Sequence, residues 1–134
     1  FENEMHADFA ELGKYKKIHF VLIGNENRSV KLSTKVIDFK KNIINSQLKD
    51  IKYEAKFFDE NDFTNFTETF KTFDVVYPSI GENFSFLKRL IKKNNLKINF
   101  VTRKEDEFCW KFSNKGYFNF KSNIPIILST FKLN

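Results

Sequence analysis

The feature that most constrains the fold is a short, nearly continuous apolar run at residues 18–23, Ile-His-Phe-Val-Leu-Ile, which ends at Gly24-Asn25. A strand with one exposed face alternates apolar and polar residues, whereas a strand covered on both faces is apolar along most of its length. We therefore expect residues 18–23 to form a strand with helices packed against both of its faces.

A helix is predicted to follow at residues 29–48. Its apolar residues recur at spacings of three and four, which places them on one helix face. These residues are Leu32, Val36, Phe39, Ile43, Ile44 and Leu48. We expect this face to cover the first strand.

A second strand is predicted at residues 52–58, followed by a second helix. The acidic run at residues 59–62 is typical of a helix start, because Asn61 or Asp62 can accept hydrogen bonds from free amides. Phe63, Phe66 and Phe70 would then form the apolar stripe of this helix.

Strand–helix alternation continues with strands predicted at residues 73–77 and 97–102 and a helix at residues 84–94 between them. Such alternation implies right-handed crossovers and a parallel sheet. The sequence thus predicts a doubly wound α/β fold with a mainly parallel, four- to five-stranded sheet and helices on both faces. The 134 residues are the length of one domain, so we expect a single α/β domain over residues 1–134, either complete or as the N-terminal domain of a longer chain.

The segment Pro-Ser-Ile-Gly-Glu-Asn at residues 78–83 follows the third strand. Pro78 ends the strand because it has no amide to donate, and Gly81 permits backbone conformations that other residues avoid. In open parallel sheets, ligands bind beyond the carboxyl ends of the strands. We therefore predict that Ser79, Gly81 and Glu82 bind substrate, with the alternative that Glu82 is only a favourable charge at the start of a helix.

The charge of the chain favours a solvated surface over a nucleic-acid interface. The net charge of +6 comes from twenty Lys and three Arg, and the Lys residues are spread along the sequence. Recognition of phosphates and bases favours forked Arg side chains and clustered charge. We therefore consider nucleic acid an unlikely partner.

Several classes of site are disfavoured by the remaining residues. A single cysteine, Cys109, excludes an internal disulfide and a cysteine-rich zinc site. His6 and His19 are distant in sequence, so no metal site is predicted, and no catalytic residue is assigned. No apolar run reaches the ~18–20 residues of a membrane span, and residues 1–14 do not resemble a signal peptide. A cytoplasmic protein without a membrane span is expected.

The order of these segments resembles a known family. The stretch at residues 73–87, FDVVYPSIGENFSFL, is similar to the third strand and following loop of the N-terminal, pre-ATP-grasp domain of ATP-grasp ligases, particularly the carbamoyl-phosphate-synthase-like group. The flanking stretches at residues 59–76 and 101–118 resemble that domain as well. The resemblance covers about residues 51–131.

The resemblance implies a function and one cofactor-binding residue. It implies that the chain is the substrate-side domain of an ATP-dependent carboxylate-amine ligase and is not catalytic alone. Lys115 corresponds to a lysine that approaches the nucleotide phosphates, residues 105–112 form a helix, and Ile124-Pro125 stands where the next domain begins. ATP and Mg would bind only in a longer protein, with none for this chain alone. The implied partners are a small-molecule substrate or a following ATP-grasp domain.

A different interpretation of the C-terminal part stays open. Residues 109–120, CWKFSNKGYFNF, also fit two alternating strands joined by a turn at Gly116. Trp110, Phe112, Phe118 and Phe120 would then alternate along a hairpin, with Lys115 at its tip. This arrangement favours a small-ligand sensor or protein-interaction domain, somewhat resembling periplasmic ligand-sensing modules.

Overall fold

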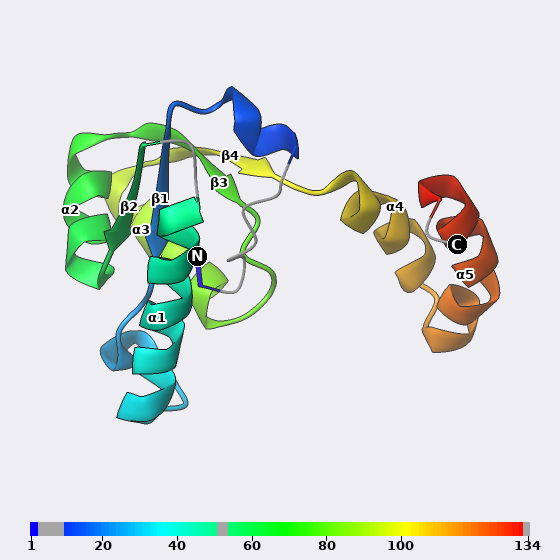
Figure 1. Ribbon diagram of the computed structural model, residues 1–134, viewed down its shortest axis with the longest axis horizontal. Helices are drawn as coiled ribbons and strands as arrows, with labels where there is room; N and C mark the ends of the chain where they lie inside the picture. Colours follow the sequence, from blue (N-terminus) through cyan, green and yellow to red (C-terminus); the bar gives the residue numbers. More distant parts are fainter. Residues whose placement is uncertain (3–9, 51–53, 133–134) are drawn as a thin grey trace. The chain divides into compact units, whose positions relative to one another are not determined.

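The computed structural model describes residues 1–2, 10–50 and 54–132 (Figure 1). The chain divides into two compact units, Phe1–Val101 and Thr102–Asn134. Along the described part of the first unit, the elements are η1 (Ala10–Lys14), β1 (Lys17–Val21), η2 (Asn25–Asn27), α1 (Thr34–Asp50), β2 (Glu54–Phe58), α2 (Glu60–Thr69), β3 (Thr72–Val76), α3 (Glu82–Asn94) and β4 (Lys97–Val101). The second unit contains α4 (Lys104–Ser113) and α5 (Tyr117–Phe131). The chain is therefore a mixed α/β protein.

The four strands form two parallel pairs. In the first pair β1 runs beside β2, with Lys17 opposite Glu54. In the second, β3 runs beside β4, with Thr72 opposite Lys97. The parallel direction predicted from the sequence is confirmed, but the predicted single sheet of four to five strands is wrong, because the described strands form two separate two-stranded sheets.

Side chains connect the two strand pairs where a continuous sheet would have backbone hydrogen bonds. The Tyr15 hydroxyl, just before β1, donates a hydrogen bond to the Asp74 carboxylate on β3. Val21 on β1 and Val75 on β3 belong to the same buried cluster. The pairs are thus neighbours in one core rather than neighbours in one sheet.

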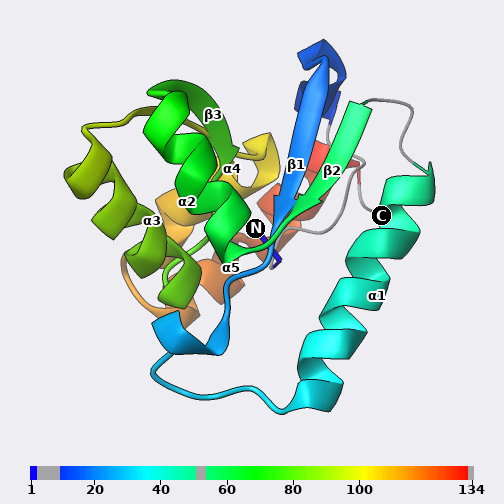
Figure 2. The same ribbon diagram turned by 90° about the vertical axis from the view of Figure 1, so that its left-hand side faces the viewer.

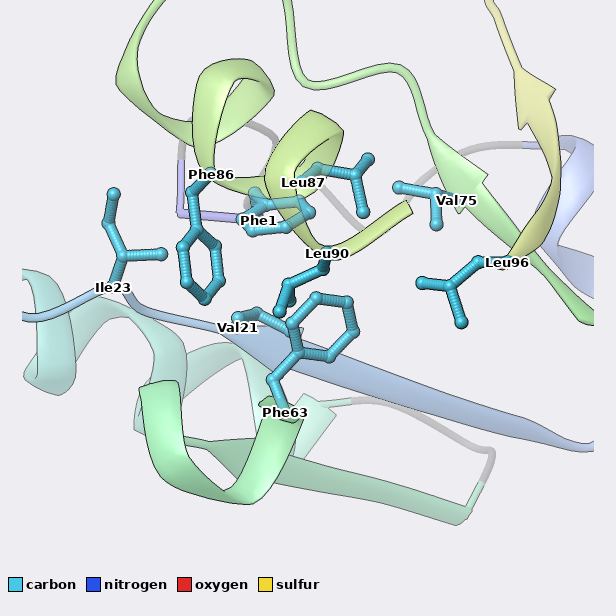
Figure 3. Packing of buried hydrophobic residues seen from close by; sticks show 9 residues of the cluster. All are labelled: Phe1, Val21, Ile23, Phe63, Val75, Phe86, Leu87, Leu90 and Leu96. Atoms are coloured by element: carbon cyan, nitrogen blue, oxygen red, sulfur yellow. The ribbon is translucent and has the colours of Figure 1, made fainter. Parts of the chain in front are cut away.

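That core gathers side chains from both pairs and from two helices, as Figure 3 shows. Its buried members are Phe1, Val21, Ile23, Phe63, Val75, Phe86, Leu87, Leu90 and Leu96. A second cluster lies on the other face of β1, where Phe20 and Leu22 contact Ile44 of α1. Figure 2 shows α1 on one side of the β1–β2 pair and α2 on the other. The prediction that β1 is covered by helices on both faces is confirmed.

Helix α1 is shorter and buries a narrower face than predicted. It begins at Thr34 rather than at residue 29, and Ile44 is fully buried, with Ile37 and Leu48 packed beside it. Val36 and Phe39 are instead 40% and 64% exposed. They lie about 80° and 140° from Ile44 around the helix axis, so the predicted stripe was too wide.

The start of α2 is stabilised by a reciprocal pair of hydrogen bonds. Asp59 is the N-cap, and its carboxylate accepts a hydrogen bond from the Asp62 amide at 2.9 Å. The Asp62 carboxylate accepts one from the Asp59 amide at 3.2 Å. Such a capping box satisfies two helix-terminal donors at once. The acidic run was correctly predicted to start a helix, although the capping residue is Asp59 rather than Asn61 or Asp62.

The second unit is a pair of helices, so the predicted hairpin over residues 109–120 is wrong and the predicted helix over residues 105–112 is confirmed. The Phe108 ring contacts Phe112 and Phe131 edge-on, with centroids 5.3 and 5.4 Å apart. No residue of α4 is buried, which differs from the expected burial of Phe108, Cys109 and Phe112. Ile124 and Pro125 lie inside α5 rather than in a linker. Across both units, none of the described helices is both long enough and apolar enough to cross a bilayer.

The shared core can be tested by substituting Leu87→Ala. Leu87 is completely buried in the cluster that contains both strand pairs, and removing a buried leucine costs about 2–5 kcal/mol of unfolding free energy. Urea denaturation followed by circular dichroism should show this loss in one transition. The control Ile80→Ala removes a side chain that is 90% exposed and should change stability by about 0.5 kcal/mol or less; equal effects of the two substitutions would contradict the assigned core.

Candidate functional site

Two loops meet at the carboxyl ends of β1 and β3. The carboxylate of Glu82, the first residue of α3, accepts hydrogen bonds from the Ser29 amide and hydroxyl, both at 2.7 Å. It also accepts from the Val30 amide at 3.2 Å and from Arg28 Nη1 at 3.2 Å. We call these contacts the Glu82 junction. It joins the loop after β1 to the loop after β3.

The backbone of the loop after β3 is specialised for this junction. Gly81 is the N-cap of α3 and has a φ of 151°, in a region that side chains with a Cβ rarely adopt. Ser79 has a φ of 53°, in the left-handed region that is uncommon for residues other than glycine. The two unusual conformations turn the chain sharply between Pro78 and α3, so that Glu82 faces the loop after β1.

The junction keeps Glu82 ionised far into the acid range. The hydrogen bond from the Ser29 hydroxyl, with further bonds from the Val30 and Ser29 amides and from Arg28, lowers the pKa of Glu82 to about 2, although partial burial opposes the shift. Glu82 therefore does more than lie in the first turn of a helix. Since its carboxylate is already bound by the chain itself, its predicted role in substrate binding stays a prediction.

A hollow of about 430 Å³ lies beside the junction. Its lining residues come from the loop after β1 and from α3 with its N-cap: Asn27, Ser29, Gly81, Glu82, Ser85 and Arg89. Arg89 donates a hydrogen bond to the Asn27 side-chain oxygen, and Asn27 in turn donates to the Glu60 carboxylate. Glu60 also accepts from the Gly24 amide at 2.9 Å. The hollow is thus bordered by a chain of polar contacts from α3 to α2.

The predicted site residues have different positions. Gly81 and Glu82 line the hollow, whereas Ser79 is exposed in the same loop and is not among the lining residues. Lys115 is exposed in the turn between α4 and α5, in the second unit, and is not among the lining residues either.

Sequence reasoning missed Asn27, Ser29, Ser85 and Arg89. The loop that contains Asn27 and Ser29 follows β1 directly. The rule that ligands bind beyond the carboxyl ends of parallel strands therefore applied to this loop as well as to the loop after β3. Ser85 and Arg89 follow Gly81 at spacings of four and eight, which places them on the same side of α3. Both signals were present in the sequence.

The lining of the hollow combines hydrogen-bond donors with the Glu82 carboxylate. Arg89 supplies a guanidinium, Ser85 supplies a hydroxyl, and the first turn of α3 begins at Gly81 without a side-chain cap. Within residues 1–2, 10–50 and 54–132, no group of three His, Cys, Asp or Glu side chains is arranged to hold a metal ion.

Comparison with known proteins adds no further guide. No protein-family model, curated protein or solved structure matches this chain. The likeness to ATP-grasp ligases therefore depends only on the stretches at residues 59–76, 73–87 and 101–118.

Substitution Glu82→Gln should remove part of the acid sensitivity of the fold. A carboxyl whose pKa falls from 4.5 when unfolded to about 2 when folded stabilises the folded state above pH ~4.5. That contribution is lost as the pH falls from about 4.5 towards 2. Urea denaturation at a series of pH values should show the variant less stable at pH 7 and flatter over this interval. The control Glu68→Gln, at an exposed position of α2, should keep the wild-type profile; an unchanged profile in Glu82→Gln would contradict the junction.

Proposed function

We propose that the first unit binds a small anionic molecule, with a carboxylate or phosphate group, in the hollow bordered by Ser85 and Arg89. The observation that carries the proposal is the pairing of charges around the hollow. The acidic group, Glu82, is engaged by Arg28 and by the loop after β1. The basic group, Arg89, has a neutral partner, Asn27.

The guanidinium of Arg89 has hydrogen-bond donors beyond the one that Asn27 uses. A guanidinium carries five N–H groups in a fixed fork that matches carboxylate and phosphate oxygens, and one of them donates to Asn27. This contact and the face of the Phe86 ring, 5.7 Å from the guanidinium, hold Arg89 in place. A preorganised cation binds an anion at a lower entropic cost than a mobile one.

The location of the hollow also supports ligand binding. It lies beyond the carboxyl ends of β1 and β3, where parallel α/β proteins commonly hold small ligands. Ser85 precedes Arg89 by one helical turn, so the hydroxyl and the guanidinium lie on one side of α3. The backbone at the start of α3 adds a favourable dipole for a negative group.

The proposal is tested with Arg89→Gln and its neighbour Lys88→Gln. Both variants lose one positive charge from α3, but Lys88 does not line the hollow. Charge-assisted hydrogen bonds contribute about 1.5–3 kcal/mol, so Arg89→Gln should weaken binding roughly tenfold or more, whereas Lys88→Gln should bind almost as the wild type does. The measurement is an NMR titration with small carboxylates and phosphates. Equal weakening in both variants, or no shift of the amides of residues 81–89 with any of these anions, would contradict the proposal.

A second candidate function is a more specific version of the first, in which the bound anion is the substrate of a ligase. The helix over Lys104–Ser113 is what the ligase interpretation requires, and the sensor interpretation required a hairpin at residues 109–120. In the ligase form, the first unit is the substrate-side domain of an ATP-dependent carboxylate-amine ligase, and the anion in the hollow is its carboxylic acid substrate. ATP and Mg would be bound by a following ATP-grasp domain, and Lys115 would reach the nucleotide phosphates from the turn between α4 and α5.

The ligase form predicts the behaviour of the protein as encoded by its gene. If an ATP-grasp domain follows, Lys115→Ala should weaken binding of Mg-ATP, measured by isothermal titration calorimetry, because it removes a cation near the phosphates. The control Lys121→Ala removes an exposed lysine from α5 and should leave the affinity unchanged. A gene without such a domain, or a protein indifferent to Lys115→Ala, would end the ligase form and leave anion binding by the first unit.

A further inference from the structure

A second polar cluster, separate from the lining of the hollow, surrounds Glu2. One oxygen of its carboxylate accepts hydrogen bonds from Arg28 Nη2 and from Lys40 Nζ, the latter at 2.9 Å. The other oxygen accepts from the Ile23 amide at 3.2 Å. These residues lie far apart in sequence, at the N-terminus, after β1 and on α1. We call this arrangement the Glu2 cluster.

The Glu2 cluster is strongly buried. The Glu2 side chain is completely inaccessible to solvent, the Arg28 side chain is 6% exposed and the Lys40 side chain is 21% exposed. Taking charges out of water costs free energy that a buried ion pair only partly recovers. If the Glu2 cluster served only to stabilise the fold, burying two cations around one carboxylate would be an unfavourable way to do so.

The donors of the cluster also exceed what Glu2 satisfies. Arg28 Nη2 donates additionally to the Ile23 carbonyl at 3.1 Å, and Nη1 pairs with Glu82. Arg28 Nε is buried and has no hydrogen-bond partner among the described residues. Buried donors are nearly always paired in native proteins. The unpaired Nε of Arg28 therefore indicates that the cluster can donate to more acceptor atoms than the Glu2 carboxylate supplies.

The position of the cluster matches that of a ligand site. The Ile23 amide lies just beyond the carboxyl end of β1, where parallel α/β proteins present backbone donors to anionic ligands. Lys40 and Arg28 supply two positive charges there. Without the Glu2 carboxylate, Glu82 is the remaining negative partner of these cations among residues 1–2, 10–50 and 54–132, so these three side chains would hold a net charge of +1.

We propose that Arg28, Lys40 and the Ile23 amide form a binding site for a small oxyanion, either a carboxylate or a phosphate, which Glu2 occupies as an internal substitute for the ligand. Phe1 anchors this substitute, because its ring packs edge-on against Phe63 at 5.5 Å between centroids. A tethered group competes at a high effective concentration, so free anions should bind this site only when Glu2 is removed or displaced. Phe1 and Glu2 thereby close the site to free anions.

The test uses Glu2→Gln, which keeps the size of the side chain and removes its charge. Isothermal titration calorimetry and thermal unfolding are measured with inorganic phosphate and with acetate, against chloride at the same ionic strength. We expect Glu2→Gln to bind at least one of the two anions on the order of tenfold more tightly than the wild type does, with a matching rise in melting temperature. Phosphate and acetate together show which oxyanion the site prefers.

Three further variants locate the effect. Glu54→Gln removes a carboxylate from an exposed ion pair with Lys17, 3.1 Å long, and should behave as the wild type does. Adding Lys40→Gln to Glu2→Gln should abolish the gained binding, whereas adding Arg89→Gln should not, because Arg89 belongs to the hollow. This last comparison separates failure of the Glu2 site from failure of the hollow.

The possible outcomes each decide the question. If Glu2→Gln unfolds without an anion but folds in phosphate or acetate, the proposal is supported as strongly as by direct binding. If the variant stays unfolded in both anions, or folds and responds to neither beyond the chloride control, the site is an ion pair of the fold and nothing more. Gained binding that survives Lys40→Gln would place the anion elsewhere and overturn the assignment.

Discussion

The Glu82 junction, in which one carboxylate accepts hydrogen bonds from Ser29, Val30 and Arg28, is the polar constraint that connects the two strand pairs of the first unit. No backbone ladder connects β1 with β3 among the described residues, so the two strand pairs are held together by side chains. Apolar packing in the shared core supplies most of the attraction, but such packing is not directional. The ion pair, with the hydrogen bonds from Ser29 and Val30 to the same carboxylate, fixes how the loop after β1 meets the start of α3.

This manner of connection has a consequence for the hollow. In a continuous sheet, strand pairing fixes the relative positions of neighbouring loops. Here the lining residues come from the loop after β1 and from α3 with its N-cap, and the contacts between these two segments include Arg89 with Asn27. Asn27 in turn donates to Glu60. A ligand that contacts both sides would add to these contacts, and it would stabilise the fold by an amount that rises with the logarithm of its concentration relative to its Kd. Binding and stability of the first unit should therefore be closely linked.

Much of the local structure was predictable from sequence because it depends on local patterns. The apolar run at residues 18–23 correctly predicted a strand covered on both faces, and the acidic run at residues 59–62 correctly predicted a helix start. Pairing between strands depends on residues distant in sequence. Strand–helix alternation therefore predicted the parallel direction of the strands but not whether all four strands join in one sheet. The hairpin prediction failed because two alternating aromatic residues on each side of Gly116 are too short a pattern to distinguish a strand from a helix.

The candidate site was less predictable than the fold. Gly81 and Glu82 were identified because proline, glycine and an acidic residue mark the loop after β3. The loop that contains Asn27 and Ser29 is polar without such markers, and its importance appears only when Glu82 is found opposite it. Glu2 had no signal at all, since a single acidic residue is ordinarily exposed to solvent.

Arg28 belongs to the Glu2 cluster and also contacts Glu82, which lines the hollow, so it connects the behaviour of the two proposed sites. A guanidinium has a rigid, planar set of donors, so a shift of Arg28 towards an anion in one site changes the geometry it offers to the other. Coupling of this kind is reciprocal for binding free energies: if an anion that replaces Glu2 draws Arg28 away from Glu82, a ligand in the hollow that tightens the Glu82 junction must disfavour that anion to the same extent. The position of the Arg28 side chain, rather than the pairing of the strands, would then determine which of the two sites holds an anion.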